Sequence, residues 1–558
     1  MFHTDTEAIN ILTKAKKFKP EISEKTKKIY LATGSQSTQH LVSVMNYLLY
    51  NSGINAVVKE GEYNSIRAEI MDKNSALYEF NPDFVIILPY FTDNFDYKFL
   101  WGNLQQQTVI QSNLVIPLSS EYGRYSNNIY RELEIFNSDL YVDKPTNVII
   151  ANVNELAAQI GKRQWFDQTA YAMHKLGCAM KYIPTLADYF IGIISASIGK
   201  TRKCLVLDLD NTLWGGVVAE EGSLGITLDP NEAKGEAFRA FQSYCKKLKK
   251  RGIILAVASK NDEEIAKAPF SENPNMLLKL EDIAIFKANW NDKATSLREI
   301  ANELNIGIDS LVFFDDNPAE REVISKLLPE VLVVDVPKDQ SKYVQVLYDS
   351  GAFDIVSMSN EDVLRSESYA NNAKREALQT SFADYEEYLK SLEMTAKVEK
   401  LSHSVPRFGQ LINKSNQFNL RTRRYTDAEI ETIASSDKHT LLTIDFKDKF
   451  DYYGIICCVI LKYEDENCFI DTWVMSCRVL KRGIEKLVFN AILADVQKHN
   501  VKTITAEWIP TPKNSLVKNL LEDFNFQSKE TENGTKKYKL AVETAKEYPH
   551  LIGEIKND

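Results

Sequence analysis

Short apolar segments of strand length alternate with helical segments through the first 340 residues, and this alternation limits the possible folds strongly. In the first 200 residues, the segment 38–50 has apolar side chains at helical spacing and lies between two apolar runs. Strands separated by helices favour a parallel sheet that is covered by helices on both faces. The apolar runs of this region are 29–32, 56–58, 84–88 and 148–151.

The same alternation recurs with stronger signals over residues 201–340. An apolar run at 204–209 is interrupted only by Asp208. We predict a second doubly wound α/β unit here, with a Rossmann-like parallel sheet. Its further elements are a helix over 231–252, a strand at 253–258, a strand at 311–314, a helix that begins at Pro318 and a strand at 331–336.

The pattern changes after residue 340. Residues 341–400 are polar and helical by composition, which predicts a connecting arm, and residues 401–558 predict an α+β domain. We therefore divide the chain into domains 1–200, 201–340 and 401–558, with the arm at 341–400. In the last domain we expect a β-hairpin (455–463 and 468–475), helices at 481–499 and 515–524, and strands at 503–508 and 536–540.

Composition excludes several functional classes. The chain has 558 residues, 44% hydrophobic and 26% charged, with a formal net charge of −10. A nucleic-acid binder usually has a basic excess, so that class is disfavoured. Seven cysteines without a CxxC pair disfavour a disulfide framework and a structural zinc site. We find no signal peptide and no apolar stretch of the length that a membrane span needs, so we expect a cytoplasmic protein without a membrane partner.

Two carboxylates follow the strand that begins at Cys204. Asp208 and Asp210 leave the carboxyl end of a predicted parallel strand, where open α/β sheets bind their ligands. Burying an unpaired carboxylate costs several kcal/mol, and two carboxylates this close repel each other. A bound cation relieves both penalties, and an oxygen-rich site of this kind suits Mg²⁺ together with a substrate phosphate.

Three further polar groups end or follow later elements of the same unit. Ser259 ends the next predicted strand, Lys293 lies in the helical stretch after Trp290, and the pair Asp315 and Asp316 ends a later strand. Taken alone, the Asp315–Asp316 segment could cap the helix that begins at Pro318. The order and placement of all four groups resemble the four motifs of the haloacid dehalogenase (HAD) superfamily, most of whose members are phosphohydrolases.

This resemblance implies a mechanism and a set of site residues. Asp208 is the nucleophile that forms an aspartyl-phosphate, Asp210 is the general acid and base, and Thr212 orients the nucleophile. The implied Mg²⁺ ligands are Asp208, the backbone carbonyl of Asp210, and Asp315 or Asp316. The implied phosphate-binding residues are Ser259, Lys260 and Lys293.

Spacing also bears on the substrate. The gaps from Asp208 to Ser259 and from Ser259 to Lys293 are short, and the expected helices and strands fill them, so neither leaves room for a cap domain. An open site of this kind favours bulky or carrier-tethered phosphates, or a lid from a neighbouring domain.

Longer motifs resemble the FkbH-like family, in which a capless HAD unit is fused to an SGNH-like N-terminal and a GNAT-like C-terminal domain. The resemblance implies a phosphatase for a phosphorylated small molecule or a carrier-tethered substrate. One alternative is a transferase that loads a glyceryl unit from 1,3-bisphosphoglycerate onto an acyl carrier protein, and another is a phosphate-binding scaffold. The motifs are 207–217 (LDLDNTLWGGV), 259–262 (SKND), 315–321 (DDNPAER), 416–420 (NQFNL) and 475–480 (MSCRVL).

The N-terminal domain lacks one part that an SGNH hydrolase needs. Ser35 follows the first predicted strand, where a nucleophilic serine would lie. No DxxH triplet follows, because Asp167 and His174 are seven residues apart, and a nucleophilic serine needs a base within hydrogen-bond reach. We therefore expect a non-catalytic lid, scaffold or docking domain.

The C-terminal domain departs from the GNAT pattern in its acyl-CoA loop. Lys481 stands where the first glycine of that loop belongs, which disfavours acetyl-CoA. Cys477 lies beside Arg478 and Arg482, whose charges would lower the pKa of its thiol. An acyl-carrying thiol and a buried inert cysteine both remain open. The basic residues Arg421, Arg423 and Arg424 could bind a phosphopantetheine arm or a phosphorylated sugar, or form a solvated face.

Overall fold

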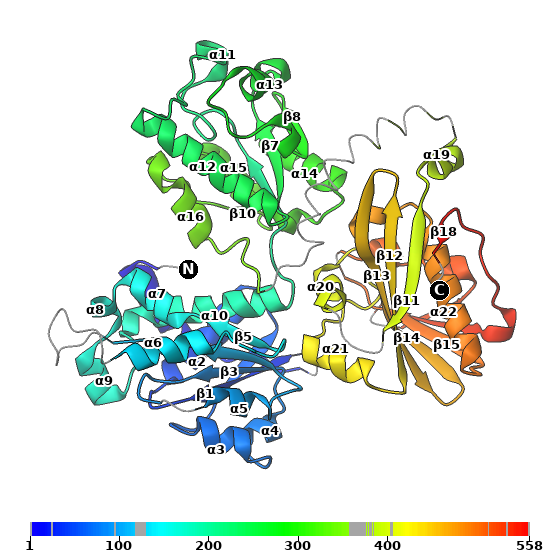
Figure 1. Cartoon of the computed structure of the whole chain (residues 1–558), viewed down its shortest axis with the longest axis horizontal. Helices are drawn as coiled ribbons and strands as arrows, with labels where there is room; N and C mark the ends of the chain where they lie inside the picture. Colours follow the sequence, from blue (N-terminus) through cyan, green and yellow to red (C-terminus); the bar gives the residue numbers. More distant parts are fainter. Residues whose placement is uncertain are drawn as a thin grey trace. The chain divides into compact units, whose positions relative to one another are not determined.

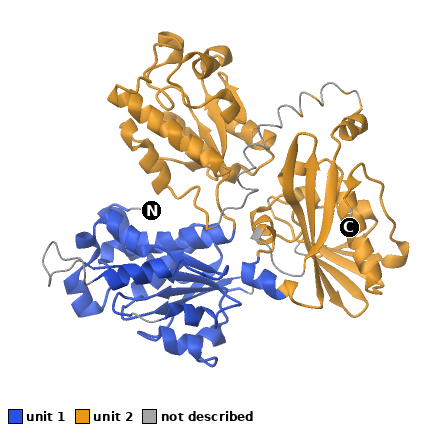
Figure 2. Cartoon of the chain, in the orientation of Figure 1, with its two compact units in different colours: residues 1–198, 425–432 blue, residues 199–424, 433–558 orange. Residues whose placement is uncertain are grey.

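The computed structural model forms two compact units (Figure 2). Residues 1–198 and 425–432 form the first unit, and residues 199–424 and 433–558 form the second. Among the described residues, no helix is both long and apolar enough to span a membrane. The structure describes residues 3–23, 26–93, 96–117, 130–356, 375, 378, 382, 384–401, 406–511, 513–531 and 534–555.

The first unit contains a five-stranded parallel sheet (Figure 1). The four apolar runs predicted from the sequence are strands, and the sheet order is β2-β1-β3-β4-β5. Strand β4 is not among the predicted strands because its Thr108, Gln111 and Ser112 are polar, although all three are buried. The strands are β1 (Lys27–Thr33), β2 (Ala56–Glu60), β3 (Phe84–Leu88), β4 (Thr108–Ser112) and β5 (Val148–Ala151).

Helices cover both faces of this sheet, as the alternation predicts. Ile29 and Leu31 of β1 pack in one core with α2 and α10, whereas Tyr30 and Ala32 pack in a second core with α3 to α5. The helices are α1 (Asp5–Ala15), α2 (Gln39–Asn51), α3 (Ile66–Met71), α4 (Ala76–Phe80), α5 (Tyr97–Trp101), α6 (Arg131–Asp139), α7 (Val153–Ile160), α8 (Lys162–Trp165), α9 (Gln168–His174) and α10 (Ile183–Ser197).

The second unit contains a further five-stranded parallel sheet, in the order β10-β9-β6-β7-β8. The run predicted at 204–209 ends as a strand at Leu207, so that Asp208 lies just beyond it. The edge strand β8 is only partly buried and is not among the predicted strands, and β10 is shorter than the predicted strand at 331–336. The strands are β6 (Cys204–Leu207), β7 (Ile254–Ser259), β8 (Ile285–Ala288), β9 (Leu311–Phe314) and β10 (Leu332–Val333).

Two helical layers enclose this second sheet (Figure 1). Leu205 and Leu207 pack against α12, α13 and α16, whereas Cys204 and Val206 pack against α14 and α15. The sheet is therefore buried on both faces, and its strand ends are the places where polar groups can gather. The helices are α11 (Val218–Glu221), α12 (Ala233–Lys250), α13 (Glu263–Glu272), α14 (Lys293–Glu303), α15 (Pro318–Leu327) and α16 (Tyr343–Asp349).

The expected connecting arm at 341–400 is divided between two cores. Tyr343 and Leu347 of α16 are buried in the core of the second sheet, where Tyr343 packs edge-on against Phe241 and Phe314. At the other end, α19 (Tyr385–Ser391) and β11 (Thr395–Leu401) pack with the third sheet. Polar composition hid these contacts because only a few residues of each segment are buried. The middle of the predicted arm, 357–374, lies outside the described residues.

The third sheet has eight strands in the order β16-β17-β15-β14-β13-β12-β11-β18. The predicted hairpin is confirmed as β13 and β14, and β14 and β15 are parallel neighbours over only four register pairs. Strands β12, β16 and β18 were not predicted. The strands after β11 are β12 (His439–Asp448), β13 (Asp451–Glu464), β14 (Asn467–Met475), β15 (Thr503–Trp508), β16 (Gln527–Glu530), β17 (Lys536–Ala541) and β18 (Gly553–Glu554).

One long helix, α22 (Ile484–Lys498), packs on the third sheet where the sequence predicts it. The helix predicted at 515–524 forms two short 3₁₀ turns, η7 (Ser515–Val517) and η8 (Glu522–Phe524), instead. The buried amide of Asn514 bonds to Thr511 and Ile509 before this segment, and the left-handed Asn525 ends it. The remaining helices are α20 (Pro406–Lys414) and α21 (Asp427–Ala434).

Candidate functional site

The predicted acidic residues meet at the carboxyl edge of the second sheet. Asp208 follows β6, Asp315 and Asp316 follow β9, and the two strands are parallel neighbours. The Asp208 amide donates to Phe314 O over 3.1 Å, which fixes the two strand ends side by side. One carboxylate oxygen from each of the three aspartates lies within 4.8 Å of the others. The sequence motifs thus converge as expected, and these residues could hold a metal ion.

A buried ammonium lies against this group of carboxylates. Lys293, the first residue of α14, places its Nζ 3.0 Å from Asp208 Oδ1 and 2.5 Å from Asp315 Oδ2. Only 5% of the Lys293 side chain is exposed, and none of the Asp315 side chain is. A buried ammonium between two carboxylates stabilises both of them, because a buried charge without a counterion is costly.

The electrostatics of the group show an excess of negative charge. Burial, together with the charge of Asp208, raises the pKa of Asp315 to about 6, although Lys293 opposes the shift. The same two causes raise the pKa of Asp316. Lys293 is buried, which would lower the pKa of its ammonium, but Asp208 and Asp315 outweigh burial and raise it. One lysine does not neutralise three carboxylates, so the site favours a further cation.

Asp210 lies at the same edge in a different environment. Its Oδ1 accepts hydrogen bonds from Trp214 Nε1 (2.9 Å) and the Val218 amide (3.0 Å), and its Oδ2 accepts one from Asn261 Nδ2 (3.2 Å). Burial raises the pKa of this carboxyl group, although the hydrogen bonds oppose the shift. A carboxyl group with a raised pKa and a fixed orientation is suited to donate and accept protons.

The chain turns sharply between Asp210 and α11. Asn211 has a left-handed backbone (φ 54°), and its side chain accepts a hydrogen bond from the Gly216 amide. Gly216 has φ 92°, and a Cβ there would lie 2.1 Å from Glu221 Oε1. The Asn211 carbonyl accepts from Tyr343 OH over 3.1 Å, so α16 also supports this turn.

Thr212 has a different partner from the one that the resemblance implies. Its fully buried hydroxyl accepts a hydrogen bond from the Asp316 amide (3.3 Å) and donates to Asp316 Oδ1 (3.4 Å). Thr212 therefore orients Asp316, whereas the sequence analysis expected it to orient Asp208. Arg321, to which the sequence analysis gave no role, donates to the carbonyl oxygens of Asp315 and Asp316 and fixes the same loop.

Ser259 is the last residue of β7, and Lys260 follows it at the same carboxyl edge of the sheet. Ser259 is 6% exposed, and its carbonyl accepts a hydrogen bond from the Asn289 amide after β8. The ammonium of Lys260 pairs with Glu320 of α15. Asn261 belongs to the motif 259–262, but no role was predicted for it. Its contact with Asp210 could have been suspected from its place directly after two predicted site residues.

The first sheet also has a polar cluster at its carboxyl edge, around Ser35. The Ser35 hydroxyl donates to Asp93 Oδ1 over 2.6 Å and lies 3.1 Å from Asn64 Oδ1. A Cβ on Gly34 would lie 1.8 Å from Asp93 Oδ2, so only glycine allows this approach. His174, the last residue of α9, is exposed. Among the described residues, the hydroxyl thus has a carboxylate and an amide as partners.

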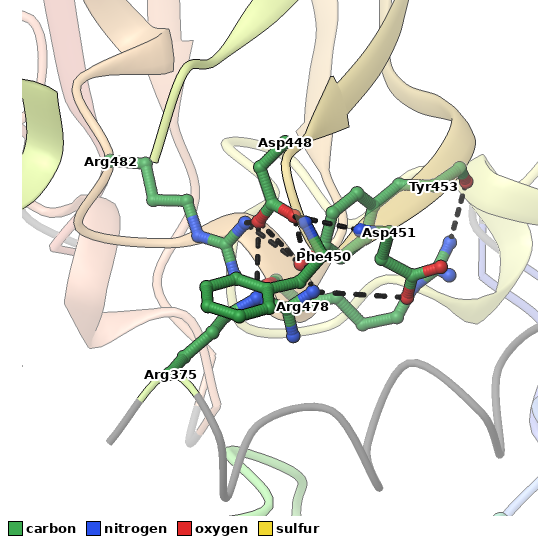
Figure 3. A network of polar contacts seen from close by, with 7 residues as sticks. All are labelled: Arg375, Asp448, Phe450, Asp451, Tyr453, Arg478 and Arg482. Carbon is green, nitrogen blue, oxygen red and sulfur yellow. Dashed lines mark hydrogen bonds and ion pairs between the residues drawn. The ribbon is translucent and has the colours of Figure 1, made fainter. Parts of the chain in front are cut away.

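The arginines beside Cys477 belong to a buried polar network (Figure 3). Arg482 Nη1 lies 2.7 Å from Asp448 Oδ2 and 2.9 Å from Tyr453 OH. Arg478 donates to the Tyr453 carbonyl, and Arg375 donates to Asp448. From the sequence, these charges are expected to act on the Cys477 thiol. In the structure their hydrogen bonds hold the segment between β14 and α22.

The basic residues at 421–424 also have internal partners. Arg421 pairs with Asp471 and Glu507, and Arg423 pairs with Asp471. Arg424 donates to the carbonyl oxygens of Ile412 and Ser415, as well as to Asn416. These contacts favour a structural role over the binding of a phosphopantetheine arm.

Fold and site together define an α/β protein with a carboxylate-rich, cation-accepting site at the carboxyl edge of a parallel sheet. Residues 28–115 match the model of the FkbH N-terminal domain. No curated protein matches the chain.

Solved structures give a more extensive match. The N-terminal part of BF1531 from Bacteroides fragilis, described as containing a phosphatase domain complexed with Mg, is 33% identical, with a TM-score of 0.55. The match covers 64% of this chain and 100% of that one. The chain therefore belongs to the same family as BF1531, and it is an FkbH-like protein.

Two acetyltransferase structures also align with part of the chain. The ribosomal-protein-S18-alanine N-acetyltransferase from Escherichia coli is 11% identical, with a TM-score of 0.21, over 27% of this chain and 99% of its own. PseH from Campylobacter jejuni is 14% identical, with a TM-score of 0.20, over 26% of this chain and 97% of its own.

Proposed function

We propose that the domain built on the second sheet is a Mg²⁺-dependent phosphatase of the HAD superfamily that hydrolyses a phosphate monoester. The observation that carries this proposal is the convergence of Asp208, Asp315 and Asp316 around Lys293 at one sheet edge. The 33% identity to the Mg-complexed phosphatase structure supports it independently.

In the proposed reaction, Asp208 attacks phosphorus and the bond to the leaving oxygen breaks. Phosphate-ester hydrolysis is very slow without a catalyst, and a covalent aspartyl-phosphate divides it into two easier steps. Asp210 gives its proton to the leaving oxygen, so that an alcohol departs. Asp210 then takes a proton from water, whose oxygen attacks phosphorus and releases inorganic phosphate and free Asp208.

Other side chains hold the phosphoryl group during these steps. Lys293 already lies against Asp208 and offers a positive charge to the phosphoryl oxygens. Ser259, at the end of the neighbouring strand β7, offers a hydroxyl at the same edge. Two further side chains hold the loop that carries the acidic pair. Thr212 accepts a hydrogen bond from the Asp316 amide, and Arg321 donates to the carbonyl oxygens of Asp315 and Asp316.

The acidic residues fit a magnesium ion. Three carboxylates with oxygens within 4.8 Å of one another match the hard oxygen ligands that Mg²⁺ prefers, and burial together with the charge of Asp208 raises the pKa values of Asp315 and Asp316. Asp208, Asp315 and Asp316 would hold the ion. When bound, Mg²⁺ neutralises phosphoryl oxygens during transfer.

The two flanking domains have separate proposed roles. We propose an SGNH-like first domain without hydrolase activity, because the Ser35 hydroxyl is bonded to Asp93 and Asn64. A lid, scaffold or docking role for a carrier-tethered substrate fits this arrangement. For the third domain we propose a GNAT-like fold, supported by β14 and β15, which separate after four register pairs, and by α22, which follows Gly483.

A second candidate function is transfer of a glyceryl unit from 1,3-bisphosphoglycerate to an acyl carrier protein through the Cys477 thiol. One observation favours it: Cys477 lines a pocket together with Lys203, Arg407, Lys414 and Lys513, whose charges suit an anionic acyl donor. Lys203 precedes β6 and Asp208 follows it, so this pocket lies at the opposite sheet edge from Asp208. Thioester formation and phosphate release would then occur at separate sites.

The primary experiment measures phosphate release from a panel of phosphate esters, with Mg²⁺ and with EDTA. We expect turnover with Mg²⁺, and its loss in EDTA and in Asp208→Asn. Asp262→Asn, at the cap of α13, is the matched control and should retain turnover. Turnover that survives in Asp208→Asn would refute the proposed nucleophile, and no turnover on any ester would favour the scaffold alternative.

The transferase alternative has its own test. After incubation with 1,3-bisphosphoglycerate, intact mass spectrometry should detect a glyceryl adduct that disappears in Cys477→Ser. An adduct of equal yield in Cys477→Ser, or no adduct with the wild-type protein, would contradict this alternative.

A further inference from the structure

An ion pair connects the two loops on either side of the Asp208 strand. Lys260 follows β7, Glu320 lies in the first turn of α15 after β9, and Lys260 Nζ lies 2.6 Å from Glu320 Oε1. In the sheet, β6 lies between β7 and β9. Neighbouring strands are about 4.8 Å apart, so the pair reaches across roughly 10 Å, past the strand end that carries Asp208.

Both ends of this pair are attached to the site through the next residue in the chain. Asn261, after Lys260, donates to Asp210 over 3.2 Å. Arg321, after Glu320, donates to the carbonyls of Asp315 and Asp316. The Lys260–Glu320 pair is therefore positioned at the rim of the phosphatase site.

Both side chains of the pair are partly exposed to water. The Lys260 side chain is 42% exposed and that of Glu320 is 17% exposed. Ion pairs in contact with water contribute little to stability, so replacing one partner by another anion costs little. By contrast, Lys293 is held between two carboxylates and is almost fully buried. The two lysines of the site thus differ in their freedom to exchange partners.

We propose that Lys260 is a specificity-determining residue that binds an acidic group on the leaving portion of the substrate. Glu320 occupies this position in the free protein and is displaced when the substrate binds. The inference rests on the proposed function, because it places the phosphoryl group at Asp208. It narrows the substrate class to phosphate monoesters that carry a second anionic group, a carboxylate or a further phosphate.

A binding experiment with two ligands of similar size tests this inference. Phosphoglycolate and ethyl phosphate differ mainly in that a carboxylate replaces a methyl group. We would measure both dissociation constants by calorimetry with Mg²⁺, in the Asp208→Asn background that prevents turnover. We expect phosphoglycolate to bind about tenfold more tightly, since a charge-assisted hydrogen bond to Lys260 is available only to the carboxylate.

Variants of the pair should change this preference in opposite directions. Lys260→Met should abolish the preference for phosphoglycolate over ethyl phosphate. Glu320→Gln should increase this preference about threefold, because the competing carboxylate is removed. Glu320→Gln should have no effect when Lys260 is already methionine. Glu322→Gln is the matched control, since Glu322 pairs with Lys326 on the same helix and both side chains are well exposed.

Several outcomes would overturn the inference. An unchanged preference in Lys260→Met would show that another group binds the acid. Equal weakening of both ligands in Lys260→Met would show that the pair only holds the loops together. No binding of either ligand to Asp208→Asn, together with no competition by either ligand against p-nitrophenyl phosphate turnover when Asp208 is intact, would contradict the phosphoryl site itself. Phosphate release from p-nitrophenyl phosphate by the protein with Asp208 intact tests the proposed function separately, since the binding preference does not require turnover.

Discussion

The first two sheets have the same parallel architecture but different chemistry at their carboxyl edges. In the first, the Asp93 carboxylate accepts hydrogen bonds from the Ser35 hydroxyl, the Ser35 amide and the Tyr90 amide. In the second, Asp208, Asp315 and Asp316 face one another around a single lysine. The Asp93 carboxylate is stabilised by neutral hydrogen-bond donors, whereas the three carboxylates of the second sheet favour a further positive charge.

This contrast shows that in α/β proteins the sheet determines where a site lies, whereas the residues at the strand ends determine its chemistry. A parallel sheet brings strand ends together whatever residues they carry, and ligands tend to bind there. The charges at those ends decide whether the edge can activate a substrate. The second edge has the proposed nucleophile, the proposed proton donor and the proposed metal site, while the first has a serine whose hydroxyl donates a hydrogen bond to a carboxylate.

After the loss of turnover expected in Asp208→Asn, the largest expected effect comes from the proposed proton donor, Asp210. Asp210→Asn should lower kcat by about 10²- to 10⁴-fold, because an amide can neither give a proton to the leaving group nor take one from water. Steady-state phosphate release measures this change. The leaving group provides the internal control: an ester with a good leaving group, such as p-nitrophenyl phosphate, should lose less in the first step than an alkyl phosphate. Equal, small losses for both esters would contradict the acid–base role.

Lys293→Met should destabilise the protein by about 3 kcal/mol at pH 8, since it leaves Asp208 and Asp315 buried without their cation. The loss should be smaller at pH 5, where Asp315 can take up a proton, and smaller in the presence of Mg²⁺. Chemical denaturation with and without Mg²⁺ measures the difference. Equal destabilisation under all conditions would indicate a packing defect and no electrostatic role.

Magnesium affinity should depend on pH through Asp315. In the metal-free protein its pKa is raised to about 6, so the folded protein holds a proton there that the unfolded chain releases near pH 4. This group's contribution to stability therefore falls as pH rises from about 4 to 6. Because Mg²⁺ must displace the proton, affinity should rise up to about tenfold per pH unit below 6 and level off above it. Calorimetry at pH 5, 6, 7 and 8 checks this, and a flat profile would contradict it.

The smallest effect is expected at the first edge. Ser35→Ala removes one hydrogen bond to Asp93 and should cost about 1 kcal/mol, with the two amide donors still present. Phosphate release should not change. A large loss of phosphatase activity in Ser35→Ala would show that the first domain contributes to the reaction, and would remove the contrast between the two edges.

Much of the fold could be predicted from local patterns. Continuous apolar runs identified β1, β3, β6 and β9, because strands buried on both faces need apolar residues at every position. The same rule failed for β4, whose buried Thr108 and Gln111 are polar, and for the partly exposed edge strand β8. The helix predicted at 515–524 failed because helical spacing does not reveal the side chains that fix its two ends.

The sequence by itself determined the composition and the place of the candidate site. An aspartate that directly follows an apolar strand, and a double acid after another, must lie at strand ends, and parallel sheets collect such ends at one edge. Only the tertiary structure decided which partner each side chain takes. Thr212 bonds to Asp316, Lys260 to Glu320, and Arg482 to Asp448, in each case between segments far apart in the chain. These choices depend on the order of strands in the sheet and on distances of a few ångströms, and neither is encoded in a local pattern.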